Sequence, residues 1–367
     1  MKKILFNIVL LGLAQFSNAQ APQGYYNSAT GTGYTLKTQL YNIIKDHSTK
    51  PYNALWTLYT SNPAAFNDNW YDSTDRNKIM DIYSEKPNDP DAYTYTPGVK
   101  QCGNYSGEGS CYNREHLVPQ SVFNENSPMV SDPFHIWPTD GYVNGKRSNY
   151  AFGVVSTATW TSTNGSKLGN NTNSGYSAGY SGTVFEPIDE FKGDIARAYF
   201  YFATRYQENG IQNWSYAMFN GTKDKVFTDT FLKILMTWHV NDPVSPREIA
   251  LNNTIYSYQN NRNPFIDNPE YAQKIWGNVL SSNDFKFQER TDIEVYKKSS
   301  KTHTVVLRNL EAEIVSIYIY DLNGKLIKQL NNTNSSQKID FTVEEKGNYI
   351  IKVIGDSFEI NKKILIN

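Results

Sequence analysis

The chain has 367 residues and a formal net charge of -1, with 39% hydrophobic and 14% aromatic residues. This composition supplies enough apolar material for a folded core and excludes an intrinsically disordered chain. The near-neutral charge disfavours tight nonspecific binding to nucleic acid, which requires basic surface, but it does not exclude catalysis at one locally basic cleft.

The first residues have the pattern of an exported protein. The basic Met1-Lys2-Lys3 precedes an apolar run from Ile4 to Phe16, and the small residues Ser17-Asn18-Ala19 follow. This order is typical of a signal peptide, and we predict cleavage after residues 1–19. No later stretch approaches the roughly 20 apolar residues of a membrane span. We therefore expect a soluble mature protein without a membrane span, secreted or at the cell surface.

Apolar residues at helical spacing predict two helices near the start of the mature chain, over 36–47 and 52–60. We expect both helices to pack in the core. Alternation over 78–84 predicts a strand, and the prolines within 87–98 predict a loop after it.

The only two cysteines, Cys102 and Cys111, lie in a loop rich in Gly, Ser and Asn. In an exported protein such a pair predicts a disulfide. Closing this short loop contributes on the order of 2–3 kcal/mol in the chain-entropy picture. The alternative, a metal site, lacks the paired short Cys spacings of zinc sites. We expect the disulfide to make rigid the loop that leads into the next segment.

That segment predicts a strand, a strand and a helix. The first strand contains residues 115–118 and the second contains residues 135–137, and each is stopped by a proline. Thr139 or Asp140 can then cap a helix that continues to Asn149.

The rest of the chain completes a helix-rich α+β domain and then predicts a second domain that is all β. Residues 156–183, rich in Ser, Thr, Asn and Gly, are read as strands or as a surface loop. Further helices are predicted over 188–206, 231–240, 246–259 and 269–276. Short alternating strands with turns between them begin after residue 283 and predict a small β-sandwich. We place the helix-rich domain at 20–286 and the all-β domain at 287–367.

The candidate catalytic residues are Glu115, His116 and Asn144. Glu115 and Asn144 offer the hard oxygen ligands that Mg²⁺ accepts, with Mn²⁺ or Ca²⁺ as alternatives. His116 can remove a proton from water near neutral pH. A lone histidine more often has a structural role, and Asn144-Gly145 also fits an ordinary turn. Adjacent strand residues point to opposite faces, so this hypothesis requires a twisted or bulged strand end.

In the mechanism that these residues suggest, His116 takes a proton from a water that attacks phosphorus in line. The divalent cation at Glu115 and Asn144 neutralises charge on the phosphoryl oxygens, and the products carry 5′ phosphates. General-base assistance contributes roughly 10²–10⁴ in rate. Arg147 lies on the same helix face as Asn144 and is expected to clamp the scissile phosphate, with a solvated arginine as the alternative. His135 is expected to be a core or supporting histidine.

Three segments together resemble the endonuclease I family of exported bacterial nucleases: Asn113 to Pro119, Gly141 to Asn149, and Glu186-Pro187 with Lys192 to Ala198. The resemblance implies a ββα-metal (His-metal finger) motif. In it, His116 matches the general base, and Glu115 and Asn144 match the two protein ligands of Mg²⁺. The implied substrate is DNA, with RNA as a further possibility.

The chain also departs from that family. Better-known members place an arginine between the base and the helix, whereas no arginine lies between His116 and Arg147 here. The phosphate-binding cation must then come from elsewhere, and Arg147 and Arg197 are the candidates. Where members often carry His-Asn-Leu, this chain has His135-Ile136-Trp137.

The tail resembles a second family, the C-terminal sorting domain of type IX secretion. The resemblance lies in residues 315–325, 347–353 and 362–366. It implies passage across an outer membrane by the type IX machinery, followed by removal or anchoring of the domain. An accessory β-domain that binds sugar or a partner protein is the alternative.

The leading hypothesis is a secreted endonuclease that acts on DNA, and on RNA as a further substrate, with little sequence preference. Nothing in the chain resembles a base-reading helix. A noncatalytic exported binder of glycans or proteins is a second hypothesis, suggested by 27 Tyr and 7 Trp. A zinc hydrolase that uses His116 and His135 is a third, but the chain lacks a His-Glu-x-x-His helix.

Overall fold

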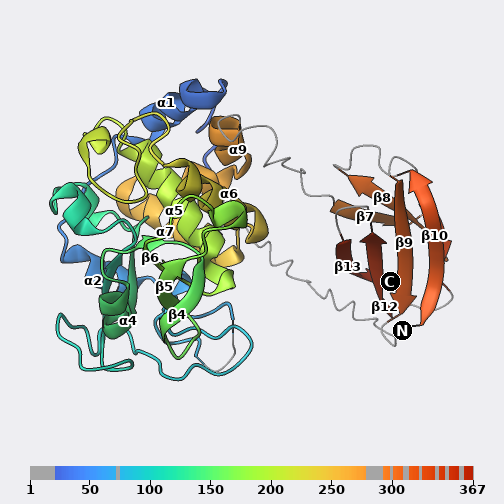
Figure 1. The fold of residues 1–367 in the computed structure, drawn as a ribbon, viewed down its shortest axis with the longest axis horizontal. Helices are drawn as coiled ribbons and strands as arrows, with labels where there is room; N and C mark the ends of the chain where they lie inside the picture. The colour runs from blue at the N-terminus through green and yellow to red at the C-terminus, as the bar shows by residue number, and fades with distance from the viewer. Residues whose placement is uncertain are drawn as a thin grey trace, which may run out of the picture. The chain divides into compact units, whose positions relative to one another are not determined.

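The chain forms two compact units, Met1–Asp284 and Phe285–Asn367, drawn in Figure 1. The structure, a computed structural model, describes residues 21–71 and 75–277, and in the second unit residues 292–297, 301–308, 314–321, 325–334, 339–343, 347–354 and 359–366. The predicted signal peptide and the predicted boundary near residue 287 lie outside these described residues. The architecture is α+β, as predicted.

The first unit is built mainly from helices. Those described are α1 (Gly33–Ile44), α2 (Ala54–Ser61), α3 (Pro63–Phe66), α4 (Gly141–Arg147), α5 (Lys192–Arg205), α6 (Asp229–Asn241), α7 (Pro246–Gln259), α8 (Pro264–Asp267) and α9 (Glu270–Trp276). The helices predicted over 36–47, 52–60, 188–206, 231–240, 246–259 and 269–276 correspond to α1, α2, α5, α6, α7 and α9. Sequence periodicity therefore located these helices correctly.

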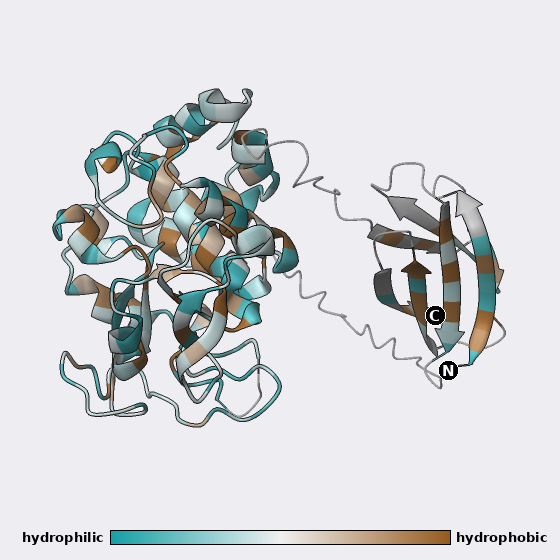
Figure 2. Cartoon of the chain, in the orientation of Figure 1, coloured by the Kyte–Doolittle hydropathy of each residue, from teal (hydrophilic) through white to brown (hydrophobic). Residues whose placement is uncertain are grey.

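Helix α5 is the centre of this unit. Every residue from Gly193 to Arg205 is buried, which is expected of a helix that other elements surround on all sides. Helices α1, α6 and α8 pack against it. Its Phe200 stacks on Trp276 of α9, with ring centroids 5.0 Å apart. Figure 2 shows apolar positions gathered on the helices inside the unit and hydrophilic residues on the outer loops.

The predicted strand-strand-helix segment is present, although the first strand ends at His116 and the second continues through Pro138 instead of stopping there. Strand β1 (Tyr112–His116) pairs antiparallel with β2 (Ile136–Asp140), and α4 follows β2 directly. The Asp140 side chain caps α4, because its Oδ1 accepts a hydrogen bond of 2.8 Å from the Val143 amide. The helix ends at Arg147, two residues before the predicted end.

A four-stranded sheet follows α4, so the strand alternative for residues 156–183 is confirmed. Its strands are β3 (Ala151–Phe152), β4 (Val155–Thr161), β5 (Lys167–Asn171) and β6 (Thr183–Glu186), in the order β3-β6-β5-β4.

The strand predicted over 78–84 is wrong. Beyond a single bridge between Asn67 and Ile79, the segment turns. The cause is Asp81, whose carboxylate accepts a hydrogen bond from the Tyr83 amide and whose carbonyl accepts one from Glu85. Local side-chain to backbone bonds of this kind compete with strand pairing.

The second unit has two antiparallel sheets, ordered β10-β9-β12-β13 and β11-β8-β7. Its strands are β7 (Asp292–Lys297), β8 (Thr302–Arg308), β9 (Ile314–Asp321), β10 (Leu326–Asn334), β11 (Ile339–Thr342), β12 (Gly347–Ile354) and β13 (Glu359–Ile366). Alternate residues of β9, namely Val315, Ile317 and Ile319, enter one apolar core shared by both sheets. Two sheets around a shared core form a sandwich, as predicted. In the described parts of both units, no helix has the length and apolarity needed to cross a bilayer.

Candidate active site

A cavity of about 400 Å³ lies where the end of β1 meets α4. Glu115 and His116 reach it from β1, and Asn144 reaches it from α4. The structure thus brings together the three residues that the sequence proposed for catalysis, although about thirty positions separate the strand pair from the asparagine.

Strand β1 presents two adjacent side chains to this cavity without a bulge. Its pairing with β2 is regular, with Glu115 opposite Trp137 and His116 opposite Ile136. Neighbouring strand residues point to opposite faces, but His116 is the last residue of β1. The cavity lies at this strand end, where both side chains can border it.

The carboxylate of Glu115 is held by two partners inside the protein. Its Oε1 accepts a hydrogen bond of 2.9 Å from the Tyr83 hydroxyl and pairs with Nη1 of Arg147 at 3.1 Å. Glu115 is 1% exposed, and this burial raises the pKa of its carboxyl to about 7, against the opposing effects of Arg147 and Tyr83. A cation in the cavity would favour the ionised carboxylate.

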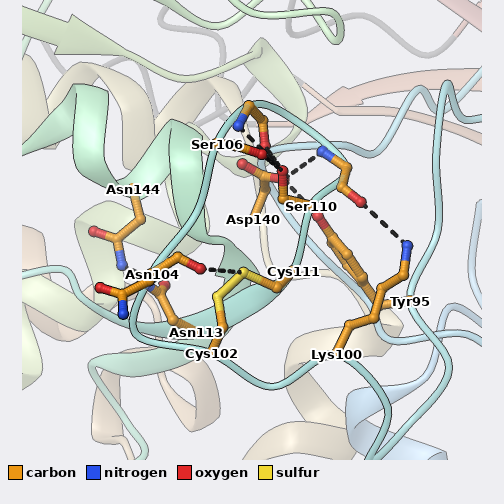
Figure 3. Close-up of a disulfide and its surroundings, with 12 residues drawn as sticks. Tyr95, Lys100, Cys102, Asn104, Ser106, Ser110, Cys111, Asn113, Asp140 and Asn144 are labelled. Atoms are coloured by element: carbon orange, nitrogen blue, oxygen red, sulfur yellow. Dashed lines mark hydrogen bonds between the residues drawn. A yellow bond between two sulfur atoms is a disulfide. The ribbon is translucent and has the colours of Figure 1, made fainter.

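The amide of Asn144 is oriented by a second asparagine. Nδ2 of Asn144 donates a hydrogen bond of 2.7 Å to Oδ1 of Asn113, and Figure 3 shows the two side chains close together. Because its nitrogen is engaged there, Asn144 has its oxygen left for a cation. Asn113 was not among the predicted site residues, although it lies two residues before Glu115 and therefore on the same strand face, which was the available signal.

These observations favour a divalent cation at this site. An oriented amide oxygen and a buried carboxylate border the same cavity, and such hard oxygen donors suit Mg²⁺, Mn²⁺ or Ca²⁺ better than softer metals. Glu115 and Asn144 are the residues that would hold it.

His116 has the geometry of a neutral base. Its Nε2 lies 3.3 Å from the carbonyl oxygen of Val130, so a proton on Nε2 can be donated to that oxygen, and Nδ1 then keeps its lone pair. Burial, with a smaller effect from His135, lowers the pKa of His116 to about 3. The ring is therefore uncharged at neutral pH, which is the form that accepts a proton.

His135 is a core histidine, as predicted. It is buried, its Nε2 lies 2.8 Å from the carbonyl oxygen of Met129, and its ring packs on Phe202. Its ring centroid is 6.0 Å from that of His116. Since the Nε2 atoms of both histidines face backbone carbonyls, the geometry does not favour the zinc hypothesis.

The structure does not support the predicted role of Arg147 as a phosphate clamp. The side chain borders the cavity but is 1% exposed. Its Nη1 pairs with Glu115 and donates a hydrogen bond of 2.7 Å to the His116 carbonyl, and its Nη2 donates to the Leu117 carbonyl. The terminal nitrogens are thus used inside the protein. Arg147 fixes the catalytic end of β1 instead of reaching toward a substrate.

The structure also gives no support to the predicted contact of Arg197 with nucleic acid. Arg197 is 0% exposed and does not border the cavity. Its guanidinium binds Glu248 of α7, Asp194 of α5 and the carbonyl of Asp242, which follows α6. It therefore joins three helices. The sequence could not reveal this role, because the acidic partners are distant in the chain or look like ordinary helix-face charges.

Arg114 is a cavity cation that was not predicted from the sequence. It borders the cavity beside His116 and is partly exposed. Its guanidinium carbon lies 3.5 Å from the ring centroid of Tyr52 and 4.6 Å from that of Trp56. Nη1 donates a hydrogen bond of 3.0 Å to the Tyr52 carbonyl. The only hint in the sequence was that Arg114 and His116 share one face of β1 by strand alternation.

The predicted disulfide joins Cys102 and Cys111, whose Cα atoms are 5.8 Å apart, and Figure 3 shows it beneath the loop that it closes. Tyr105 of this loop borders the cavity and packs against α4. Gly145 permits that approach, because a Cβ at this position would overlap the Tyr105 hydroxyl. The closed loop thus forms one wall of the cavity.

Comparison with known proteins identifies the families that the two parts of the chain match. The profile of the family described as Endonuclease I matches residues 32–270, and that of the Secretion system C-terminal sorting domain matches residues 299–367. The Extracellular ribonuclease of Bacillus amyloliquefaciens is 31% identical over 257 residues, which cover 69% of this chain and 78% of the relative. The Extracellular ribonuclease of Bacillus subtilis (strain 168) is 30% identical with the same coverage.

Replacing Arg197 tests whether it is structural. Arg197→Met leaves the buried Glu248 carboxylate without its cation, whereas Asp194 keeps its ion pair with Arg247, so we expect a loss of about 3–5 kcal/mol in the free energy of unfolding. The measurement is urea denaturation followed by tryptophan fluorescence. Arg76→Met, at an exposed arginine, is the matched control and should change little. Unchanged stability combined with weaker nucleic-acid binding would restore the original assignment.

Proposed function

The chain belongs to the endonuclease I family, and we propose that this secreted nuclease is a metal-dependent endonuclease that hydrolyses phosphodiester bonds of both RNA and DNA. The observation that carries the proposal is the convergence of Glu115, His116 and Asn144 on one cavity. A base, together with a carboxylate and an oriented amide that can hold a divalent cation, suits metal-assisted hydrolysis of a phosphodiester.

The substrate class follows from two considerations. Two relatives that cover most of the chain are named extracellular ribonucleases, which supports RNA as a substrate in addition to DNA. The groups at the cavity suit a phosphate and a cation, and the residues that line it include no base-reading helix of the kind by which proteins select a sequence. We therefore propose cleavage with little sequence preference.

The first chemical task falls to His116. Nδ1 takes a proton from a water molecule as its oxygen bonds to phosphorus, while Nε2 stays anchored on the Val130 carbonyl. The bond from phosphorus to the 3′ oxygen breaks on the opposite side, that oxygen gains a proton from solvent, and the product keeps a 5′ phosphate. Burial lowers the pKa of His116, which keeps the ring in the neutral form that can accept this proton.

The remaining residues stabilise the negative charge on the phosphate and position the groups around it. A divalent cation, most simply Mg²⁺, held by Glu115 and Asn144 would neutralise the charge that develops on the phosphoryl oxygens. Arg114 supplies the second positive charge at the cavity, in a guanidinium already aligned by the rings of Tyr52 and Trp56. Arg147 keeps Glu115 and the His116 carbonyl in place.

We propose that the C-terminal unit serves export. Its sorting-domain match supports recognition by type IX secretion machinery. The nuclease unit then acts outside the cell or at its surface, in agreement with the extracellular relatives.

His116→Ala should reduce cleavage of both supercoiled plasmid and RNA by about 10²–10⁴, because the general base is lost. Chelation of divalent cations with EDTA should stop cleavage by the wild type. Tryptophan fluorescence melting checks that the variant is folded. Wild-type cleavage rates in the folded variant would contradict the assignment of the base. Undiminished cleavage in EDTA would support a hydrolase that needs no divalent cation, and absence of cleavage of either substrate with any added cation would support the noncatalytic binder.

Arg114→Met should lower kcat/KM by about 10²-fold, the usual effect of removing one group that stabilises transition-state charge. Methionine keeps the apolar stem against Tyr52 and Trp56, so the loss reports on charge and not on packing. The control is Arg76→Met, which removes an exposed arginine elsewhere in the same unit. A kcat/KM within twofold of the wild type would exclude Arg114 from the reaction.

A further inference from the structure

A second group of acidic side chains lies outside the catalytic cavity. Asp68, Glu85 and Asp91 each place a carboxylate oxygen within 4.8 Å of the other two. Asp68 follows α3, and the other two lie in the irregular segment before β1. Asp68 and Glu85 are each 1% exposed, whereas Asp91 is partly exposed. Two buried carboxylates and a third at the surface therefore converge from separate parts of the chain.

Asp68 lacks the partners that a buried carboxylate normally has. Its Oδ1 accepts two long hydrogen bonds of 3.5 Å, from the amides of Trp70 and Tyr71. Its Oδ2 is buried and has no hydrogen-bond partner among the described residues. No lysine, arginine or histidine in the described part of the chain forms an ion pair with Asp68. An unpaired anionic oxygen beside two further carboxylates is costly to bury.

We propose that Asp68, Glu85 and Asp91 bind a structural Ca²⁺ ion. Three carboxylates offer up to six hard oxygens, and Ca²⁺ accepts six to eight in flexible geometry, whereas Mg²⁺ demands a near-octahedral set that irregular segments seldom supply. Weak affinity is sufficient, because extracellular modules bind Ca²⁺ with Kd values of about 10⁻⁴–10⁻³ M. The partly exposed Asp91 gives the ion an entry path and room for water.

The ion would brace the segment that supports the catalytic residues. Between Asp68 and Glu85 in the sequence lie Asp81, whose Oδ2 accepts a hydrogen bond of 2.8 Å from the Asp140 amide, and Tyr83, whose hydroxyl binds Glu115. Asp140 in turn caps α4. Tying Asp68 to Glu85 closes this segment into a loop, so the ion is a positioning element and takes no part in hydrolysis.

Thermal unfolding followed by tryptophan fluorescence tests the proposal. All 7 Trp precede residue 277, so the signal reports on the first unit alone. The protein is stripped with EDTA, dialysed, and melted with and without about 5 mM Ca²⁺, several times the Kd expected of an extracellular site. Every variant is made in the Asn144→Ala background, which removes one proposed ligand of the catalytic cation. We expect Ca²⁺ to raise Tm by about 5 °C, and Asp68→Asn to abolish most of that shift.

The matched control is Asp89→Asn, at an exposed aspartate in the same segment but outside the cluster, which should retain the full shift. Terbium luminescence excited through tryptophan is the second readout, since Trp70 is two residues from Asp68. Asp68→Asn should lose most of the sensitised emission, and Ca²⁺ should displace Tb³⁺ at much lower concentration than Mg²⁺.

Two results would overturn the proposal. One is a Ca²⁺ shift in Asp68→Asn equal to that of the Asn144→Ala background. The other is a Tm that Ca²⁺ leaves unchanged while Asp68→Asn raises it, which would mean that the three carboxyl groups share protons and bind no cation. If Asp68→Asn does not fold, Asp91→Asn at the partly exposed position is judged by the same two readouts. Neither outcome depends on whether the catalytic assignments are correct.

Discussion

The buried ion pair between Arg147 and Glu115 is the interaction on which the cavity depends. It joins the last residue of α4 to β1, and the same guanidinium also binds the carbonyls of His116 and Leu117. A single side chain therefore fixes the carboxylate, the backbone of the base and the angle at which the helix meets the strand. Removing one partner of a buried pair leaves an uncompensated buried charge, which typically costs about 3–5 kcal/mol.

Other residues support the site on either side of the Arg147–Glu115 ion pair. Asn113 orients Asn144 across the gap between β1 and α4, and the disulfide-closed loop covers the helix through Tyr105 where Gly145 allows close approach. Tyr83 reaches Glu115 from the segment between α3 and β1. Each proposed site residue thus contacts a second residue that is itself held in place. Losing such an outer partner commonly costs roughly 10–100-fold in metal affinity or activity.

Much of this could be predicted from the sequence, because the governing signals are local. Helical periodicity located α5 and α7, and the short apolar runs followed by Asp140 predicted β1, β2 and α4. The convergence of Glu115, His116 and Asn144 on one cavity was expected because the strand pair and the helix asparagine each lie in a recognisable segment. The strand prediction over 78–84 failed at Asp81. Its side chain accepts a hydrogen bond from the nearby Tyr83 backbone, and such a local bond outweighs an alternating pattern.

The predictions that the structure does not support concern charged residues whose partners come from other parts of the chain. Arg147 and Arg197 look like free cations in the sequence, and only the fold shows that Glu115, Asp194 and Glu248 occupy them. Arg114 was overlooked because its position relative to Tyr52 and Trp56 depends on how α2 packs on β1. The convergence of Asp68 with Asp91 is likewise invisible in the sequence, because no spacing pattern relates the two positions.

The central claim is that a carboxylate and an asparagine on two different elements hold one cation beside the base. The most direct measurement is the Mg²⁺ concentration that gives half-maximal RNA cleavage by the wild type and by Asn144→Ala. We expect that concentration to rise at least about 10-fold in the variant, the usual effect of losing a metal-site contact. An identical Mg²⁺ dependence in the two proteins would contradict the account.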